Sequence, residues 1–164
     1  MNDTLLLLVF WYFFVPFSLI GYGLVFQRIA IKNHSNLNFG YAGLIGIFLL
    51  IIYSYLSHIF ISHFKLHNLL IIIGGFVGYL FFLYTNKNNI LKETVVTLIV
   101  LLILFASFLI YKNHDDFSYY HFPYTYFLTQ HDLTLGLGNF GHGFRTQSSI
   151  FYLNSLFYLP LIDY

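Results

Sequence analysis

The chain has 164 residues, of which 59% are hydrophobic and only 8% are charged, and its mean hydropathy is +0.75. Soluble domains usually carry about 25% charged residues, so this composition indicates an integral membrane protein. A formal net charge of +1 excludes the broad basic field of a nucleic-acid-binding protein, and we expect no nucleic-acid partner. The absence of cysteine excludes disulfides, thiolate nucleophiles and cysteine metal sites.

Four apolar segments, each free of Lys, Arg, Asp and Glu, have close to the roughly 20 residues that cross a bilayer as a helix. They cover about residues 5–26, 41–62, 68–85 and 94–111. We therefore predict an all-α, polytopic membrane protein in which residues 1–111 form four spanning helices. The lipid bilayer is its first expected partner.

The distribution of cations predicts the orientation of these helices. The connections after the first and third spans each carry two cations, whereas the second connection has only Lys65. Because cytoplasmic connections are enriched in Lys and Arg, we expect the amino terminus and residues 112–149 on the extracytoplasmic side. The expected topology is multi-pass.

The composition changes after the fourth predicted span. Residues 112–149 are polar and aromatic, and hold four of the eight histidines and three of the six acidic residues. Long loops are usually functional or disordered, so we interpret this segment as a functional loop. It is expected to carry short interfacial helices, one of them over residues 117–129, with Asp115 or Asp116 as its cap and an interruption near Pro123.

Spacings of three and four residues divide this expected helix into two faces. The aromatic face, which we expect to lie on lipid, comprises Phe117, Tyr120, Tyr124 and Phe127 or Leu128. The polar face, which would look into a cavity enclosed by the membrane helices, comprises His114, Ser118, His121 and Thr125.

Residues 150–164 form a last apolar-rich segment that is too short to span a membrane. We interpret it as an interfacial helix or as the start of a truncated fifth spanning helix. The second interpretation is favoured, and it makes the chain the amino-terminal part of a longer protein.

Glycines between residues 136 and 141 match the spacing of the dinucleotide-binding fingerprint. That fingerprint needs a strand before it and a helix after it in a soluble β-α-β unit, and neither is predicted here. We interpret the glycines as a tight turn or a close backbone approach to a ligand. The turn would present the polar side chains of Asn139, His142 and Arg145.

Four histidines, His34, His58, His63 and His67, lie in or near the first three spans and their connections. We interpret each as an interface or hydrogen-bonded residue rather than a ligand.

Two adjacent carboxylates, Asp115 and Asp116, lie between His114 and His121, directly after the fourth span. Acidic residues beside a bilayer are candidates for catalysis, because repulsion between them raises one pKa toward the range useful for proton transfer. Two other roles stay open: a simple helix cap, and a metal site, since imidazole and carboxylate suit divalent cations. No cofactor is certain, although a divalent cation would fit.

The run from His114 to Pro123, followed by Gly136 to Asn139 and by His142 to Ser149, resembles the first long external loop of bacterial GT-C type glycosyltransferases. The resemblance covers about residues 112–160. In better-known members the acidic loop follows the first helix, whereas here three further spans precede it.

This resemblance implies transfer of a sugar from a polyprenyl-phosphate carrier to an envelope glycan or lipid. Asp115 or Asp116 would be the general base. Arg145 would hold the carrier phosphate. The other substrate-binding residues would be His114, Tyr120, His121, Asn139 and His142.

Two further functions compete with this one. If 164 residues is the natural length, the protein could be a non-catalytic subunit or scaffold of an envelope complex. A transporter is disfavoured, because the four predicted spans contain no Lys, Arg, Asp or Glu to line a polar path.

Overall fold

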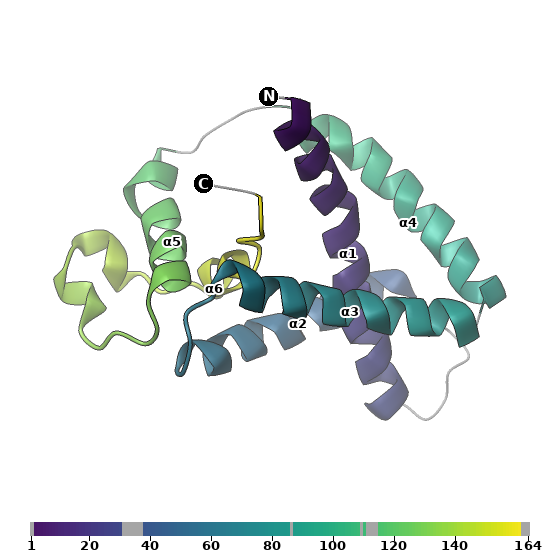
Figure 1. Cartoon of the computed structure of the whole chain (residues 1–164), viewed down its shortest axis with the longest axis horizontal. Helices are drawn as coiled ribbons and strands as arrows, with labels where there is room; N and C mark the ends of the chain where they lie inside the picture. Colours follow the sequence, from purple (N-terminus) through teal and green to yellow (C-terminus); the bar gives the residue numbers. More distant parts are fainter. Residues whose placement is uncertain (1, 31–37, 86, 109, 111–114, 162–164) are drawn as a thin grey trace. The chain divides into compact units, whose positions relative to one another are not determined.

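The computed structural model describes residues 2–30, 38–85, 87–108, 110 and 115–161 (Figure 1). Within these ranges the fold is all-α, as predicted, and contains no strand. The chain divides into two compact units: Met1–Leu49 with Ile71–Tyr111, and Leu50–Leu70 with Lys112–Tyr164. We call them the membrane unit and the loop unit.

Four long helices are α1 (Asn2–Ala30), α2 (Phe39–His58), α3 (Lys65–Thr85) and α4 (Lys87–Phe108) (Figure 1). All four are long and apolar enough to cross a membrane, which confirms the prediction of a multi-pass membrane protein. Their bounds differ from those predicted. Helix α2 ends before residue 62 and α3 begins before residue 68, so α3 takes in polar residues that find partners in the loop unit. The fourth candidate span, Ile90–Ser107, includes Lys92 and Glu93 near its start.

Helix α1 approaches both α2 and α3 closely at glycines. A Cβ atom added at Gly21 would overlap the backbone carbonyl oxygen of Gly75 in α3. One added at Gly46 in α2 would overlap the carbonyl oxygen of Leu19 in α1. In lipid, where apolar surface alone does not drive helices together, small residues allow the backbones to pack at van der Waals distance. The glycines are therefore part of the packing of the membrane unit.

Hydroxyl groups reinforce the same unit. The buried Ser18 hydroxyl of α1 donates to the carbonyl oxygen of Ile72 in α3 at 2.7 Å. The Tyr12 hydroxyl donates to the carbonyl oxygen of Leu101 in α4 at 2.8 Å. Each bond satisfies a polar group that hydrocarbon could not.

The loop unit contains the end of α2, the start of α3 and a series of short elements. These are η1 (Phe117–His121), α5 (Phe122–Gln130), η2 (Leu137–Asn139), η3 (His142–Arg145) and α6 (Ser149–Ser155). The helix predicted over residues 117–129 exists as a π turn, η1, that continues into α5. Pro123 does not interrupt it: the proline lies at the start of α5, where the π turn gives way to α-helix.

The predicted lipid-facing side of this helix is wrong for three residues. Tyr124 and Leu128 are each 1% exposed and form a core with Phe151 and Tyr152. Tyr120 is half-buried and packs on this core of the loop unit. Phe117, by contrast, is 46% exposed. The difference arises because α6 supplies an apolar partner for α5 within the loop unit, and burial against protein replaces burial against lipid.

Helix α6 begins after the N-cap residue Ser148 and is shorter than the apolar segment predicted over residues 150–164. The Ser148 hydroxyl accepts a hydrogen bond from the backbone N–H of Ile150 at 3.3 Å, as N-cap serines do. The helix has seven residues and ends at Ser155, so the described part of this segment, to residue 161, does not span a membrane. Its apolar side chains are largely buried in the loop unit instead.

The connection between α2 and α3 belongs to the loop unit. There the backbone N–H of His63 donates to the carbonyl oxygen of Leu128 in α5 at 3.0 Å. In a chain with four spans, the end of the second span and the end of the fourth lie on the same side of the membrane. The hydrogen bond between these two segments is consistent with that number of spans.

Candidate functional site

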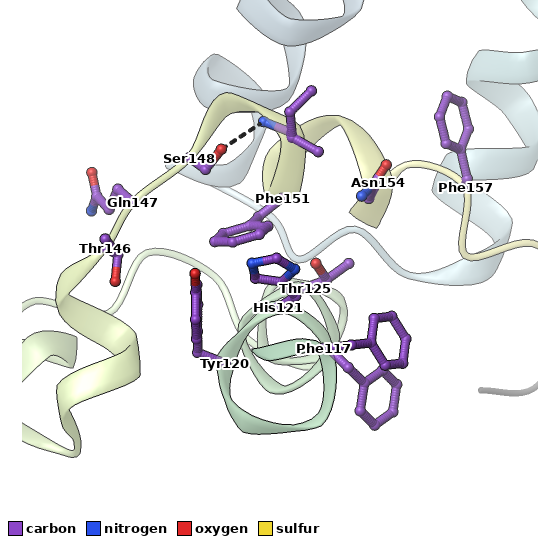
Figure 2. A pocket seen from close by; sticks show the side chains of 12 residues that line it. Phe117, Tyr120, His121, Thr125, Thr146, Gln147, Ser148, Phe151, Asn154 and Phe157 are labelled. Atoms are coloured by element: carbon purple, nitrogen blue, oxygen red, sulfur yellow. Dashed lines mark hydrogen bonds between the residues drawn. The ribbon is translucent and has the colours of Figure 1, made fainter. Parts of the chain in front are cut away.

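The loop unit contains a pocket of about 570 Å³ between η1–α5 and residues 146–157 (Figure 2). This volume lies within the roughly 300–1,000 Å³ typical of small-molecule sites. The lining combines aromatic, aliphatic and uncharged polar side chains: Phe117, Tyr120, His121, Phe122, Thr125, Thr146, Gln147, Ser148, Ile150, Phe151, Asn154 and Phe157.

Aromatic rings form the middle of the pocket. Figure 2 shows the His121 ring close to that of Phe151, with their centroids 5.2 Å apart. Tyr120 meets Phe151 at a centroid distance of 6.1 Å and an angle of 77°. Tyr124, in the core of the loop unit, lies 5.3 Å from the Phe151 ring between ring centroids. The pocket therefore has two aromatic walls close to a right angle, and Phe151 is held by a buried neighbour.

The π turn explains how two consecutive residues reach the pocket. In η1 the backbone N–H of Phe122 bonds to the carbonyl oxygen of Phe117, five residues earlier. Such a turn holds one more residue than an α-turn, and π turns are frequent at functional sites. Tyr120 and His121, at the end of this wide turn, both line the pocket.

The buried phenols of Tyr124 and Tyr152 lie behind the pocket residue Gln147. Burial raises the pKa of Tyr124, while hydrogen bonds from the side chains of Tyr152 and Gln147 act in the opposite direction. Burial also raises the pKa of Tyr152, and its contact with Tyr124 adds to the increase. Both phenols therefore stay neutral at ordinary pH, and Gln147 is held at the pocket by a phenol rather than by an ion.

The predicted acidic pair lies beside the pocket in sequence but does not line it. Asp115 is exposed and Asp116 is half-buried, immediately before η1. Asp116 occupies the N-cap position of η1, yet its side chain makes no capping hydrogen bond, so the cap interpretation is wrong for this residue. Of the predicted polar face, His121 and Thr125 line the pocket, whereas Ser118 does not. His114 lies outside the described residues.

The glycine-rich turn is confirmed. Gly136 has φ +80°, a left-handed conformation that favours glycine, and η2 follows it directly. The candidate residues that the turn presents, Asn139, His142 and Arg145, are exposed and do not line the pocket. The Arg145 Nε–H donates to the carbonyl oxygen of Gly138 at 3.1 Å, which holds the two short helices η2 and η3 together.

Sequence reasoning missed a buried polar network at the α2–α3 connection. The fully buried His63 ring lies between two hydroxyls, with Ser57 Oγ 3.0 Å from Nε2 and Ser155 Oγ 2.6 Å from Nδ1. The Ser155 hydroxyl donates to the carbonyl oxygen of Tyr152 at 2.7 Å. The Ser155 proton is used in this way, so Nδ1 of His63 donates to Ser155. The Ser57 hydroxyl, 3.0 Å from Nε2, also donates to the carbonyl oxygen of Ser54 at 3.3 Å.

Asn68 extends this network. Its buried Nδ2 donates to three carbonyl oxygens, those of His63 at 2.7 Å, Ser155 at 2.8 Å and Tyr158 at 3.0 Å. Carbonyls can only accept, so the Asn68 Oδ1 must face Nδ1 of His67, which donates to it across 3.0 Å. The network therefore joins the start of α3 to the end of α6. His63 and His67 are hydrogen-bonded residues, as predicted.

Burial controls the charge state of His63. It lowers the pKa of this imidazole to about 3, and the neighbouring His58 and His67 lower it further, against a smaller opposing contribution from a backbone hydrogen bond at Ser54. A histidine with this pKa is neutral near pH 7 and is not poised to exchange a proton there. Its role is structural. The i, i+4 spacing of His63 and His67 was the one signal in the sequence that pointed to this cluster.

The three neighbouring histidine rings do not form a metal centre. His63 lies 5.2 Å from His58 and 5.5 Å from His67 between ring centroids, and the His63 and His67 rings are parallel within 7°. Across the part of the chain that the structure describes, no group of three or more His, Asp or Glu side chains is arranged to hold a metal ion. The His114 part of the metal hypothesis lies outside the described residues.

The site thus consists of an aromatic and polar pocket whose described lining has no Lys, Arg, Asp or Glu, with an acidic pair before its first lining segment and Arg145 before its second. Such a pocket suits a ligand that has both apolar faces and polar edges. No protein-family model matches the chain, and comparisons with curated proteins and with solved structures found no match.

Proposed function

We propose that this protein is a GT-C type membrane glycosyltransferase that moves a sugar from a polyprenyl-phosphate carrier to an envelope glycan or lipid. One observation carries the proposal: a pocket lined by aromatic and uncharged polar side chains begins at Phe117, directly after Asp115 and Asp116. Aromatic faces with amide and hydroxyl groups suit a sugar ring, and an adjacent carboxylate suits proton abstraction.

The chemical step needs one base. The acceptor hydroxyl oxygen forms a bond to the anomeric carbon, the bond from that carbon to the phosphate oxygen breaks, and the phosphate leaves with the electron pair. The acceptor proton passes to a carboxylate. We assign this role to Asp116, because it is half-buried and adjoins the pocket residue Phe117, with exposed Asp115 as the alternative.

The carrier phosphate needs a cation outside the pocket. Arg145 directly precedes Thr146, the first pocket residue of its segment. Its planar guanidinium suits a phosphate, and the bond from Nε to Gly138 holds the side chain in place. His142 and Asn139, exposed on the same two short helices, are the additional candidates. In this arrangement the sugar occupies the pocket and the phosphate lies at its rim.

The proposed location is the bacterial inner membrane, with the loop unit on the extracytoplasmic side. The cation distribution supports this orientation. A tag inserted after Asn139 in the exposed turn would be labelled by a membrane-impermeant reagent in intact cells. Labelling only after the membrane is permeabilised would contradict the orientation.

The test of the reaction compares three acids of one segment. Membranes containing Asp115→Asn, Asp116→Asn or Asp132→Asn are supplied with a labelled polyprenyl-phosphate sugar, and transfer to endogenous glycan or lipid is measured. Loss of a general base typically costs about 10²–10⁴-fold in rate, so we expect such a loss in Asp116→Asn. Asp132 is exposed, does not line the pocket and does not adjoin a lining residue in sequence, so Asp132→Asn is the matched control. Full transfer by both Asp115→Asn and Asp116→Asn would refute the assigned chemistry.

A second candidate function is that of a non-catalytic membrane subunit. One observation favours it: the described residues that line the pocket include no carboxylate, so the pocket itself is built for binding. The same membranes distinguish the two functions. A subunit would bind sugar in the pocket but give no transfer when it is the only added protein.

A further inference from the structure

We infer that the pocket accepts an uncharged sugar unit and excludes sugars with a carboxylate or an ammonium group. This inference rests on the proposed function and names the substrate class of that site. It starts from the charge of the lining, which contains no Lys, Arg, Asp or Glu among its described residues. His121 is the one imidazole of the described lining, and a uronic acid in the pocket would lose water from its carboxylate without meeting a Lys or Arg side chain, which disfavours binding.

The aromatic walls fit the two apolar surfaces of a pyranose. Tyr120 and Phe151 stand at 77° to each other, so the half-buried Tyr120 ring can cover the C–H face of a sugar while the small accessible part of Phe151 meets its edge. The walls are supported from below, because Phe151 is only 6% exposed and packs on the buried Tyr124. Removing C–H surface from water at these rings is the apolar part of the binding free energy.

The polar groups match sugar hydroxyls, which both donate and accept. Figure 2 shows Gln147 and Asn154 at opposite ends of the pocket, with the Phe151 and His121 rings between them. A carboxamide has two donors and an acceptor, so it satisfies a hydroxyl in either direction without carrying charge. Thr125, on the α5 side, has a hydroxyl of the same kind. A hydroxyl or an N-acetyl group can therefore be bound at either end of the pocket.

The charged residues nearest to the pocket in sequence lie outside its lining. Asp115, Asp116 and Arg145 adjoin the lining segments in sequence but lie outside the lining. The charged residues thus act at the rim of the pocket, Arg145 on the carrier phosphate and Asp115 or Asp116 on the acceptor proton. The sugar itself is recognised by shape, aromatic contact and neutral hydrogen bonds.

The test measures sugar binding to the full chain in nanodiscs by saturation-transfer NMR. The probes are methyl glucoside, methyl N-acetylglucosaminide, methyl glucuronide and glucosamine. We expect the two neutral probes to bind at least about tenfold more tightly than either charged probe, a difference of about 1.4 kcal/mol. Gln147→Ala and Asn154→Ala should each weaken neutral binding, whereas Gln130→Ala should not. Gln130 is the matched control, since it is an exposed glutamine of the same unit that bonds to Thr129 away from the lining.

A variant that gains binding of a charged sugar must be folded, so it separates a change of specificity from unfolding. Asn154→Lys places a cation in the lining and should reverse the preference, so that methyl glucuronide binds more tightly than methyl glucoside. Equal binding of glucuronide and glucoside by the unchanged protein would overturn the inference, as would equal losses in Gln147→Ala and Gln130→Ala. Neutral binding that persists in both Asp115→Asn and Asp116→Asn while transfer is unaffected in both would support the pocket assignment and reject the catalytic one.

Discussion

Replacing Asn68 should detach α6 from the α2–α3 connection. The side chain is fully buried, and its amide bridges α3 to the carbonyl groups of Ser155 and Tyr158, 87 and 90 residues away in sequence. Asn68→Ala removes these bonds together with the one to His63 and leaves His67 Nδ1 without its acceptor. Asn68→Asp keeps the shape of the side chain and replaces its donor with an oxygen that faces three carbonyl oxygens.

The expected loss follows from the number of hydrogen bonds. Two amide N–H groups serve three carbonyls, and Oδ1 accepts one further bond, which makes three full bonds. At a net contribution of about 1 kcal/mol each, Asn68→Ala should lower the free energy of unfolding by about 3 kcal/mol. In a chain of this length, that corresponds to about 6–12 °C in melting temperature. Asn68→Asp should lose more, because oxygen–oxygen repulsion adds to the lost bonds.

The assay is thermal unfolding of the purified protein in one detergent, followed by tryptophan fluorescence and by protease cleavage after α6. Asn139→Ala is the control, because this asparagine is exposed in η2. We expect its melting temperature to stay within about 1 °C of the unchanged protein. A similar melting temperature for Asn68→Ala and Asn139→Ala would show that the buried amide does not hold α6, and the reasoning would fail.

Three further changes test other parts of the fold. The pKa of His63 is about 3 in the folded protein and near 6.5 when unfolded, so the unfolded state binds more protons between these pH values. The free energy of unfolding should therefore fall as the pH decreases through this window, by up to about 1.4 kcal/mol per pH unit. His63→Gln should make the melting temperature less dependent on pH in the same range. Gly21→Ala should lower the free energy of unfolding by about 1–3 kcal/mol, since its Cβ would overlap the carbonyl oxygen of Gly75. Gly43→Ala is the control: a Cβ added there meets its nearest atom at 3.8 Å, so this variant should melt like the unchanged protein. Ser148→Ala should remove the cap of α6 and cost about 1 kcal/mol, and Ser148→Asp, which can also cap, should restore most of it in the same assay.

The spanning helices could be predicted because their signal is local. Some 20 apolar residues in succession are sufficient to identify a membrane helix, whatever the rest of the chain does. The tight turn at Gly136 was predictable for the same reason, since only glycine adopts its φ of +80° readily. Bounds were less accurate where tertiary contacts set them, as at Asn68, which the predicted span took as its first residue and which the structure places inside α3.

The pocket could be predicted only in part. Tyr120 and His121 were candidates through the resemblance, and helical spacing placed only His121 on the polar face. Both line the pocket, although spacing put Tyr120 on the lipid-facing side. The opposite wall, with Phe151 and Asn154, lies some 30 residues further along the chain, and sequence periodicity does not specify which distant helix covers α5. Tyr124 was expected to face lipid for the same reason, because the sequence did not show that α6 would cover it.

The bonds of Asn68 and His63 also set an order of assembly. The α2–α3 connection is synthesised about 90 residues before Ser155 and Tyr158, so its amide and imidazole have no partners from α6 while α2 and α3 enter the membrane. Groups in that state need water, and water is available only at the membrane surface. The tip of this hairpin is therefore held at the surface, on the side where the rest of the chain later emerges, until α6 arrives to close it. A polar network that stabilises the finished fold thus also keeps the tip of this hairpin out of the hydrocarbon during assembly.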